Sequence, residues 1–343
     1  MTGRPMLLAH GGADGAGLSD VGLVVLTVGL LAAYGRGLHE LWGRRGVGAV
    51  VPVWRATAFV VGVVALAASQ TGPLHTLAER SFAGHMAQHM VLLVVAGPLL
   101  ALGSAGLPFA LAGPVWLRRR WARWRIGWAG RWLRRPLVLA IVAGTTQSLV
   151  LWLWHLPALY RTVLGSDLLH AAQHASFVAA AWLLWSAVLG AARHRLPPPV
   201  GLLLIFLTML PASALAAALT FAPVPLYPTG ALPPTGEPYP AGTPPPTGLD
   251  PLADQQLGGL AMWIPMDVVV LLAAVTMVLR WLNRLDRARP AGRNVPPADE
   301  ADPTGAVGLS VCRRPVGGSA GSAGGGSPGS AGGADPVTSE VTR

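Results

Sequence analysis

The sequence predicts an all-α membrane protein, a bundle of about seven transmembrane helices. Its 343 residues are 52% hydrophobic and only 12% charged, with a mean hydropathy of +0.50, whereas a soluble domain contains about 25% charged residues. The hydrophobic residues fall into separate runs, each close to the roughly 20 residues that a helix needs to cross a bilayer. We therefore predict a multi-pass membrane protein, in contact with the lipid bilayer.

Seven hydrophobic runs follow a polar, glycine-rich N-terminal segment of residues 1–17, which we expect outside the cytoplasm. The runs are Leu18–Tyr34, Val50–Thr71, His85–Leu102, Pro136–Trp154, Leu168–Leu189, Val200–Phe221 and Leu257–Leu282. Together they define a membrane domain of residues 18–285.

The positive charges predict the orientation of these spans. The net charge is +10, and the 25 basic residues are all arginine. They gather in alternate loops, above all in a block of eight from Arg118 to Arg135, whereas the loop of residues 222–256 has none. Cytoplasmic loops are enriched in basic residues, so we predict the N-terminus outside and the C-terminus in the cytoplasm. This pattern explains the basic charge without nucleic acid, which we do not expect as a partner.

Three segments between or after the spans carry their own signals. Residues 104–135 contain Pro108, Pro114 and tryptophans at helical spacing among arginines, which predicts a re-entrant or interfacial segment rather than an eighth span. The proline-rich outer loop 222–256 is expected to be irregular. Residues 286–343, rich in Gly, Ser, Ala and Pro, predict a disordered cytoplasmic tail.

Five of the nine histidines fall at the predicted outer ends of three consecutive spans. His85 and His89 begin the third span, His155 follows the fourth, and His170 and His174 begin the fifth. Histidines four residues apart share one face of a helix. The predicted topology therefore gathers all five in one extracytoplasmic layer, and His75 in the preceding loop is close enough in the chain to join them.

Such a layer predicts a metal site, because neutral imidazole is a common ligand of Cu, Zn, Fe and Ni. Met86 and Met90 lie about 100° round the helix from the histidines; their thioethers would favour Cu(I), although most methionines in such helices only pack. Asp254, at the start of the seventh span, is placed to orient imidazoles by hydrogen bonding. Asp267 lies deeper in that span, where an acid is functional by default.

The residues alone leave three functions open. The first is copper binding. The second is b-type haem held by His89 and His174 from facing helices. The third is copper transport, which would need ligands through the membrane, where only Asp267, Gln147 and Met209 stand out. Retinal is excluded because the chain has no lysine for a Schiff base. No hydrolytic triad or phosphate-binding loop is present, so we expect no enzyme activity.

Four motifs occur in order along the chain. They are His85-Met86-Ala87-Gln88-His89-Met90 followed by Gly97-Pro98, Trp154-His155-Leu156-Pro157, His170-Ala171-Ala172-Gln173-His174, and Asp254-Gln255-Gln256-Leu257-Gly258-Gly259. In these motifs the chain resembles the caa3-type CtaG family of cytochrome c oxidase assembly factors, over about residues 18–285. Gln173 departs from the pattern, since an acid is expected there, and so do the long loop and the tail.

The resemblance implies a multi-span bacterial membrane protein that serves copper insertion during assembly of a haem-copper oxidase. It therefore implies copper as the bound metal, with haem b as the alternative, and an oxidase subunit and other copper chaperones as candidate partners. His85, His89, His170 and His174 become the expected principal ligands, with His155 as a fifth. Asp254 is expected to support them.

Overall fold

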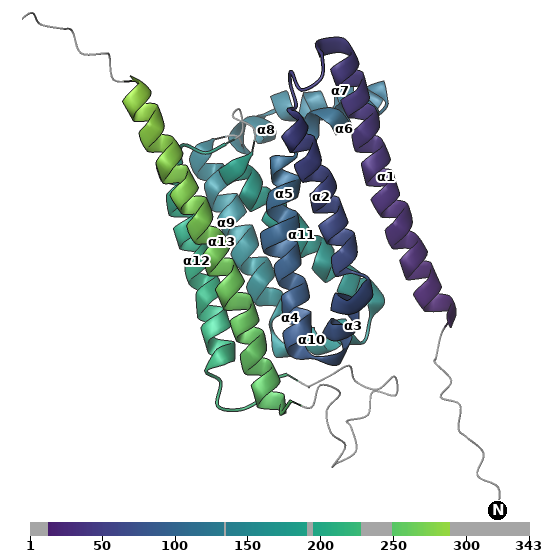
Figure 1. Ribbon diagram of the computed structural model, residues 1–343, viewed down its shortest axis with the longest axis vertical. Coiled ribbons are helices and arrows are strands. Elements are labelled where there is room, and N and C mark those ends of the chain that lie inside the picture. Colours follow the sequence, from purple (N-terminus) through teal and green to yellow (C-terminus); the bar gives the residue numbers. More distant parts are fainter. Residues whose placement is uncertain (1–12, 134, 191–194, 228–248, 289–343) are drawn as a thin grey trace, which may run out of the picture. The chain divides into compact units, whose positions relative to one another are not determined.

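The computed structural model describes residues 13–133, 135–190, 195–227 and 249–288, and every regular element in them is a helix (Figure 1). Six helical segments among these residues are long and apolar enough to cross a membrane, and the bent pair of α2 and α3 makes a possible seventh. The described part of the chain contains no strand. The predicted all-α membrane bundle is confirmed.

The seven predicted spans correspond to seven helical segments. These are α1 (Ala13–Arg45), α2 (Val53–Ser69), the run α4–η1–α5 (Phe82–Met90, Val91–Ala96 and Gly97–Leu102), α9 (Pro136–Trp154), α11 (Asp167–Leu189), α12 (Pro198–Thr220) and α13 (Pro251–Ala288). Helix α9 has the predicted bounds, because Pro136 begins it and cannot continue a preceding helix. The element η1 is a turn of π-helix within the third span.

The first and last helices are longer than the predicted spans. Helix α1 continues past Tyr34 to Arg45 and ends before Gly46, whose φ of +87° is a left-handed conformation that favours glycine. An ion pair of 2.7 Å between Arg44 and Glu40 supports this polar extension. Hydrophobic length predicts where a helix crosses the membrane, but local breakers decide where it ends.

The short loop predicted before the third span is instead a helix, α3 (Gly72–Arg80), bent by 42° from α2. It packs directly on α4. The contact requires a glycine, because a Cβ at position 84 would lie 2.5 Å from the carbonyl oxygen of Leu77. Helix α3 brings His75 to the same end of the bundle as the start of α4.

Residues 104–133 form three short helices and no eighth span. They are α6 (Gly106–Ala112), α7 (Val115–Ile126) and α8 (Trp128–Leu133), and Figure 1 shows them at one end of the bundle. Pro114 separates α6 from α7, since it removes a backbone donor and disfavours helix in the residue before it. No residue of α7 is buried, and its place in the headgroup layer stays a prediction.

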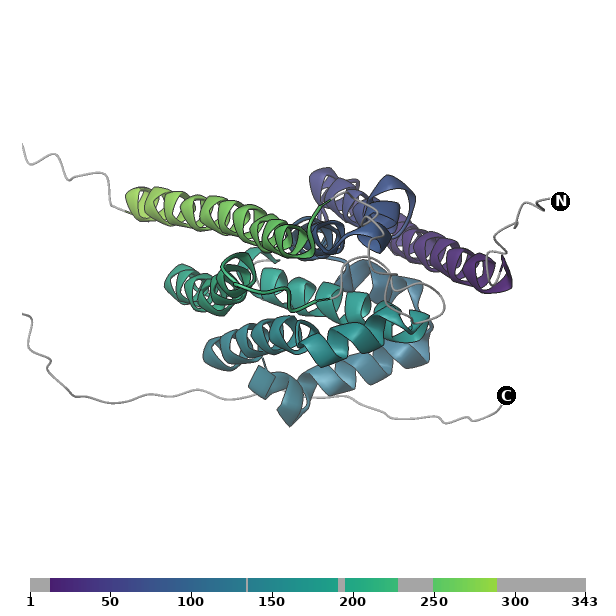
Figure 2. The ribbon, with the colours of Figure 1, turned by 90° about the horizontal axis from the view of Figure 1, so that it is seen from below.

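Five of the long segments form a closed ring. The run α4–η1–α5 contacts α13 and α11, α11 contacts α9, α9 contacts α12, and α12 contacts α13. Helix α2 packs outside this ring against η1 and α5, and α1 packs against α2 and α6. Figure 2 shows α1 and α13 on opposite sides of the bundle. The ring brings the starts of α4 and α11 next to the end of α9.

Several predictions concern residues outside the described part of the chain. They are the N-terminal segment up to residue 12, most of the proline-rich loop (residues 228–248), and the tail from residue 289. Helix α1 already begins at Ala13 and α13 ends at Ala288. The orientation of the bundle across the membrane stays a prediction.

Candidate metal centre

The first turn of α4 is fixed by acceptors from two directions. Ser81 caps the helix, its Oγ accepting a hydrogen bond of 2.9 Å from the backbone N–H of Gly84. The carboxylate of Asp254, on α13, accepts bonds of 2.7 and 3.1 Å from the backbone N–H groups of Phe82 and Ala83. The first N–H groups of a helix lack partners within it, and negative charge there is favourable. Asp254 therefore acts through the backbone of α4, instead of bonding to an imidazole as we expected.

Close packing of α13 on α4 depends on small residues. A Cβ at Gly258 would clash with the ring of Phe82, and a Cβ at Gly259 would clash with the hydroxyl of Thr220 on α12. This is the close approach for which Gly258-Gly259 is suited. It holds the start of α13, and so Asp254, against α4.

Three imidazoles converge from two helices. His85 on α4 and His170 and His174 on α11 each offer one ring nitrogen, and the three atoms all lie within 4.8 Å of one another. The ring of His85 stacks on that of His170 at 5.3 Å, and the rings of His170 and His174 are 4.2 Å apart. We call these residues the three-histidine cluster. They are three of the five predicted ligands, and they come from spans about 85 residues apart in sequence.

One nitrogen of each imidazole in the cluster lacks a partner among the described residues. Nε2 of His85, of His170 and of His174 is buried and makes no hydrogen bond with the described residues. Each buried polar group left unsatisfied costs about 1–3 kcal/mol. Three such atoms on converging imidazoles indicate a place suited to a ligand, because an electron-pair acceptor such as a metal ion can satisfy imidazole nitrogens.

The tautomer of His174 is set by a residue that the sequence analysis did not select. Its Nδ1–H donates a hydrogen bond of 2.6 Å to Oε1 of Gln70, at the end of α2, which leaves Nε2 unprotonated. The amide of Gln70 is held in turn by a bond of 2.9 Å to Oγ of Ser69. Metal-binding histidines are commonly oriented by such a bond from the other ring nitrogen. The only signal in the sequence was a glutamine at the predicted outer end of the second span.

His89 lies next to this cluster and is completely buried. Its ring is 4.4 Å from the ring of His85 and 5.2 Å from that of His174. Neither of its ring nitrogens has a hydrogen-bond partner among the described residues. His89 thus offers a further free imidazole nitrogen beside the three.

His155, just past the end of α9, is oriented by its backbone surroundings. Its Nδ1–H donates a hydrogen bond of 2.6 Å to the carbonyl oxygen of Leu151. Its own carbonyl oxygen accepts a hydrogen bond from the hydroxyl of Tyr227. Burial lowers the pKa of His155 to about 4 and raises the pKa of Tyr227 to about 12. The imidazole is therefore neutral at pH 7, and the phenol keeps its proton.

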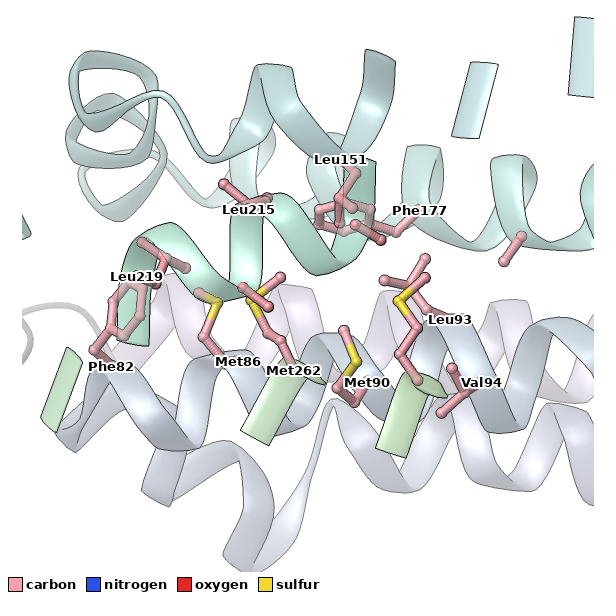
Figure 3. Packing of buried hydrophobic residues seen from close by; sticks show 14 of the residues in the cluster. Phe82, Met86, Met90, Leu93, Val94, Leu151, Phe177, Leu215, Leu219 and Met262 are labelled. Atoms are coloured by element: carbon pink, nitrogen blue, oxygen red, sulfur yellow. The ribbon is translucent and has the colours of Figure 1, made fainter. Parts of the chain in front are cut away.

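The remaining candidates lie in different surroundings. Sδ of Met86 is 3.3 Å from Nε2 of His155, whereas Met90 packs in the hydrophobic cluster with residues such as Leu93 (Figure 3). Asp267 accepts a bond of 3.2 Å from the hydroxyl of Ser213 on α12. His75, on α3, pairs with Glu79 at 3.3 Å. Of these, only Met86 touches one of the five histidines through a donor atom.

The chain matches a known protein family. A family model described as cytochrome c oxidase caa3 assembly factor (Caa3_CtaG) matches residues 32–284. The chain belongs to this family. No curated protein and no solved structure matches the chain. The resemblance read from the four motifs is thereby confirmed.

The match to the caa3 assembly factor family contains every residue of the candidate metal centre. It runs from within α1 to within α13, and so includes the five histidines, Met86, Gln70 and Asp254. The multi-pass architecture and the family together describe a membrane protein that serves as a cytochrome c oxidase assembly factor.

Proposed function

We propose that this caa3 assembly factor binds copper through the buried histidines and delivers it to a haem-copper oxidase. Two observations carry the proposal: the three imidazoles each offer a ring nitrogen within 4.8 Å of the others, and each of them has a buried Nε2 without a partner among the described residues. Copper is the cargo here, and the residues that would hold it are His85, His170 and His174, with His89 and His155 beside them.

The donor set favours a late transition metal. Imidazole suits Cu, Zn, Fe and Ni, whereas Mg, Ca and Mn prefer carboxylate and carbonyl oxygens. Asp254, the acid predicted to support the site, instead accepts hydrogen bonds from the backbone of α4. Among the metals that remain, membership of an oxidase assembly family favours copper.

The geometry argues against haem and against transport. A bis-histidine haem needs its macrocycle between the two ligands, but the rings of His89 and His174 are in edge-to-face contact at 5.2 Å. A transport pathway needs polar groups along its length. Asp267 is instead paired with Ser213, and Gln147 lines a small, mostly apolar cavity.

Delivery of copper requires no catalysed chemical step. A site of neutral ligands releases its ion to an acceptor with more or stronger ligands by ligand exchange. With the predicted orientation, the centre faces the outer side of a bacterial plasma membrane, where an oxidase subunit and other copper chaperones would be its partners.

The test is copper analysis of the protein purified in detergent after loading with copper. We expect His85→Ala and His174→Ala each to lose most of the bound copper, and His39→Ala, an exposed histidine on α1, to keep it. Equimolar copper in all three variants would contradict the proposal. A Soret band in the purified wild type would favour haem. A deletion strain should lose oxidase activity, and added copper should restore part of it.

A further inference from the structure

Met86 and His155 face each other in a way that packing does not explain. Their Sδ and Nε2 atoms are 3.3 Å apart. A neutral imidazole has one N–H, and in His155 that proton lies on Nδ1, since the carbonyl oxygen of Leu151 can only accept. The lone pair of Nε2 therefore points at a thioether sulfur, which also has only lone pairs to offer. A buried cation between the two atoms would accept a lone pair from each and form one bond with the sulfur and one with the nitrogen.

The position of Met86 is set by tightly packed neighbours. The side chain is completely buried, and a Cβ on Gly258 of α13 would lie 3.3 Å from its Cγ. Figure 3 shows Met86 and Met90 among the buried hydrophobic side chains of the core. Met90, one turn further along the helix, packs within the buried hydrophobic cluster. Both methionines are buried, but of the two it is Met86 whose sulfur lies against a histidine nitrogen.

His89 supplies a third donor on this side of the centre. It is not a member of the three-histidine cluster, its ring is 6.0 Å from that of His155, and both of its nitrogens are without partners among the described residues. It is completely buried, so water does not satisfy these atoms from bulk solvent.

We infer that the protein holds a second metal site, formed by Met86, His155 and His89 and selective for Cu(I). We call it the methionine site. This inference rests on the proposed copper function and divides its ligands into two groups. A thioether is a soft ligand that favours Cu(I) over Zn(II) or Cu(II). Two donors about 2.0–2.3 Å from one ion are themselves roughly 3–4 Å apart, and the sulfur and nitrogen already have that separation.

Two sites side by side give the protein a capacity of two copper ions. The ring of His89 is 5.2 Å from that of His174 and 6.0 Å from that of His155. An ion bound to His89 can therefore exchange His85 or His174 for His155 and Met86 without leaving the protein. The ion stays Cu(I) throughout, and the step needs no electron donor.

The test is an anaerobic titration of the purified full-length protein with Cu(I), in competition with bathocuproine disulfonate, combined with copper X-ray absorption. We expect two Cu(I) ions and a sulfur neighbour in the wild type and in Met90→Leu. In Met86→Leu we expect one tightly held ion and no sulfur neighbour. The second ion should bind at least about tenfold more weakly than in the wild type. Leucine conserves the volume of methionine, and Met90→Leu is the matched control for packing.

The outcomes separate this inference from the proposed function. If the wild type binds no Cu(I), the proposed function itself is wrong. If it binds one ion with nitrogen neighbours only, or if the sulfur neighbour persists in Met86→Leu, the methionine site is wrong and the three-histidine cluster stands. The wild-type spectrum alone decides the matter if Met86→Leu fails to fold.

Discussion

The two ends of the bundle both carry nitrogen-bearing side chains, but these are buried at one end and exposed at the other. At the histidine end, formed by the starts of α4 and α11 and the end of α9, His85 and His89 are at most 1% exposed. At the arginine end, formed by α7 and α8, no residue of α7 is buried. Figure 1 shows the two ends on opposite sides of the bundle.

The difference indicates where the function lies. Exposed arginines keep their charge at little cost, because solvent or lipid headgroups satisfy them. Buried imidazole nitrogens without partners raise the free energy of the folded protein, and four of the five histidines carry such a nitrogen. Under the proposed function, the histidine end bears this cost because it holds a ligand, whereas the arginine end is predicted only to contact the membrane surface.

The largest effect on stability is expected from the acid at the histidine end. Asp254→Ala leaves two backbone N–H groups of α4 without acceptors in a buried place, and should lower the free energy of unfolding by about 3 kcal/mol. Asp250→Ala is the exposed counterpart, since Asp250 accepts bonds from backbone N–H groups of its own helix. It should cost about 1 kcal/mol. Unfolding followed by circular dichroism in detergent measures both, and equal losses would contradict the contrast between buried and exposed caps.

A second effect should appear in metal affinity. Gln70→Met removes the acceptor that holds Nδ1–H of His174, and should weaken copper binding about 10–100-fold. Gln147→Met alters a buried amide on α9 that lines a cavity away from the histidines, and should leave the affinity unchanged. Competition with a chelator measures both variants. A similar loss in the two would indicate a general packing defect instead of a role for Gln70 in orienting His174.

The smallest effects are expected at the arginine end. Replacing Arg119, Arg120 and Arg123 of α7 by glutamine should change the free energy of unfolding by no more than about 0.5 kcal/mol, because these side chains are exposed. Copper binding should not change. Binding to anionic lipid should weaken by about 1 kcal/mol for each arginine, which nanodiscs of graded phosphatidylglycerol content can measure. Loss of copper in this variant would show that the two ends are coupled.

The chain's local patterns were enough to predict its helical architecture. Runs of apolar residues near the length of a bilayer crossing correspond to helices whose backbone hydrogen bonds lie within each segment. Pro136 begins one of these helices, and Gly46 follows the end of another. The spacing of His85 with His89 and of His170 with His174 places each pair on one helical face whatever the helix packs against. The arginine pattern likewise predicted that residues 104–133 do not cross the membrane.

The partners of those histidines depended on the tertiary structure. Gln70 meets His174, Met86 meets His155, and Asp254 meets the start of α4 across separations of 69 residues or more. A transmembrane helix is apolar on nearly every face, since lipid and protein interior are alike in polarity. Its sequence therefore sets its length without fixing its rotation about its own axis. That rotation was decided by close packing at Gly84, Gly258 and Gly259, and it determined which nitrogens were left facing one another.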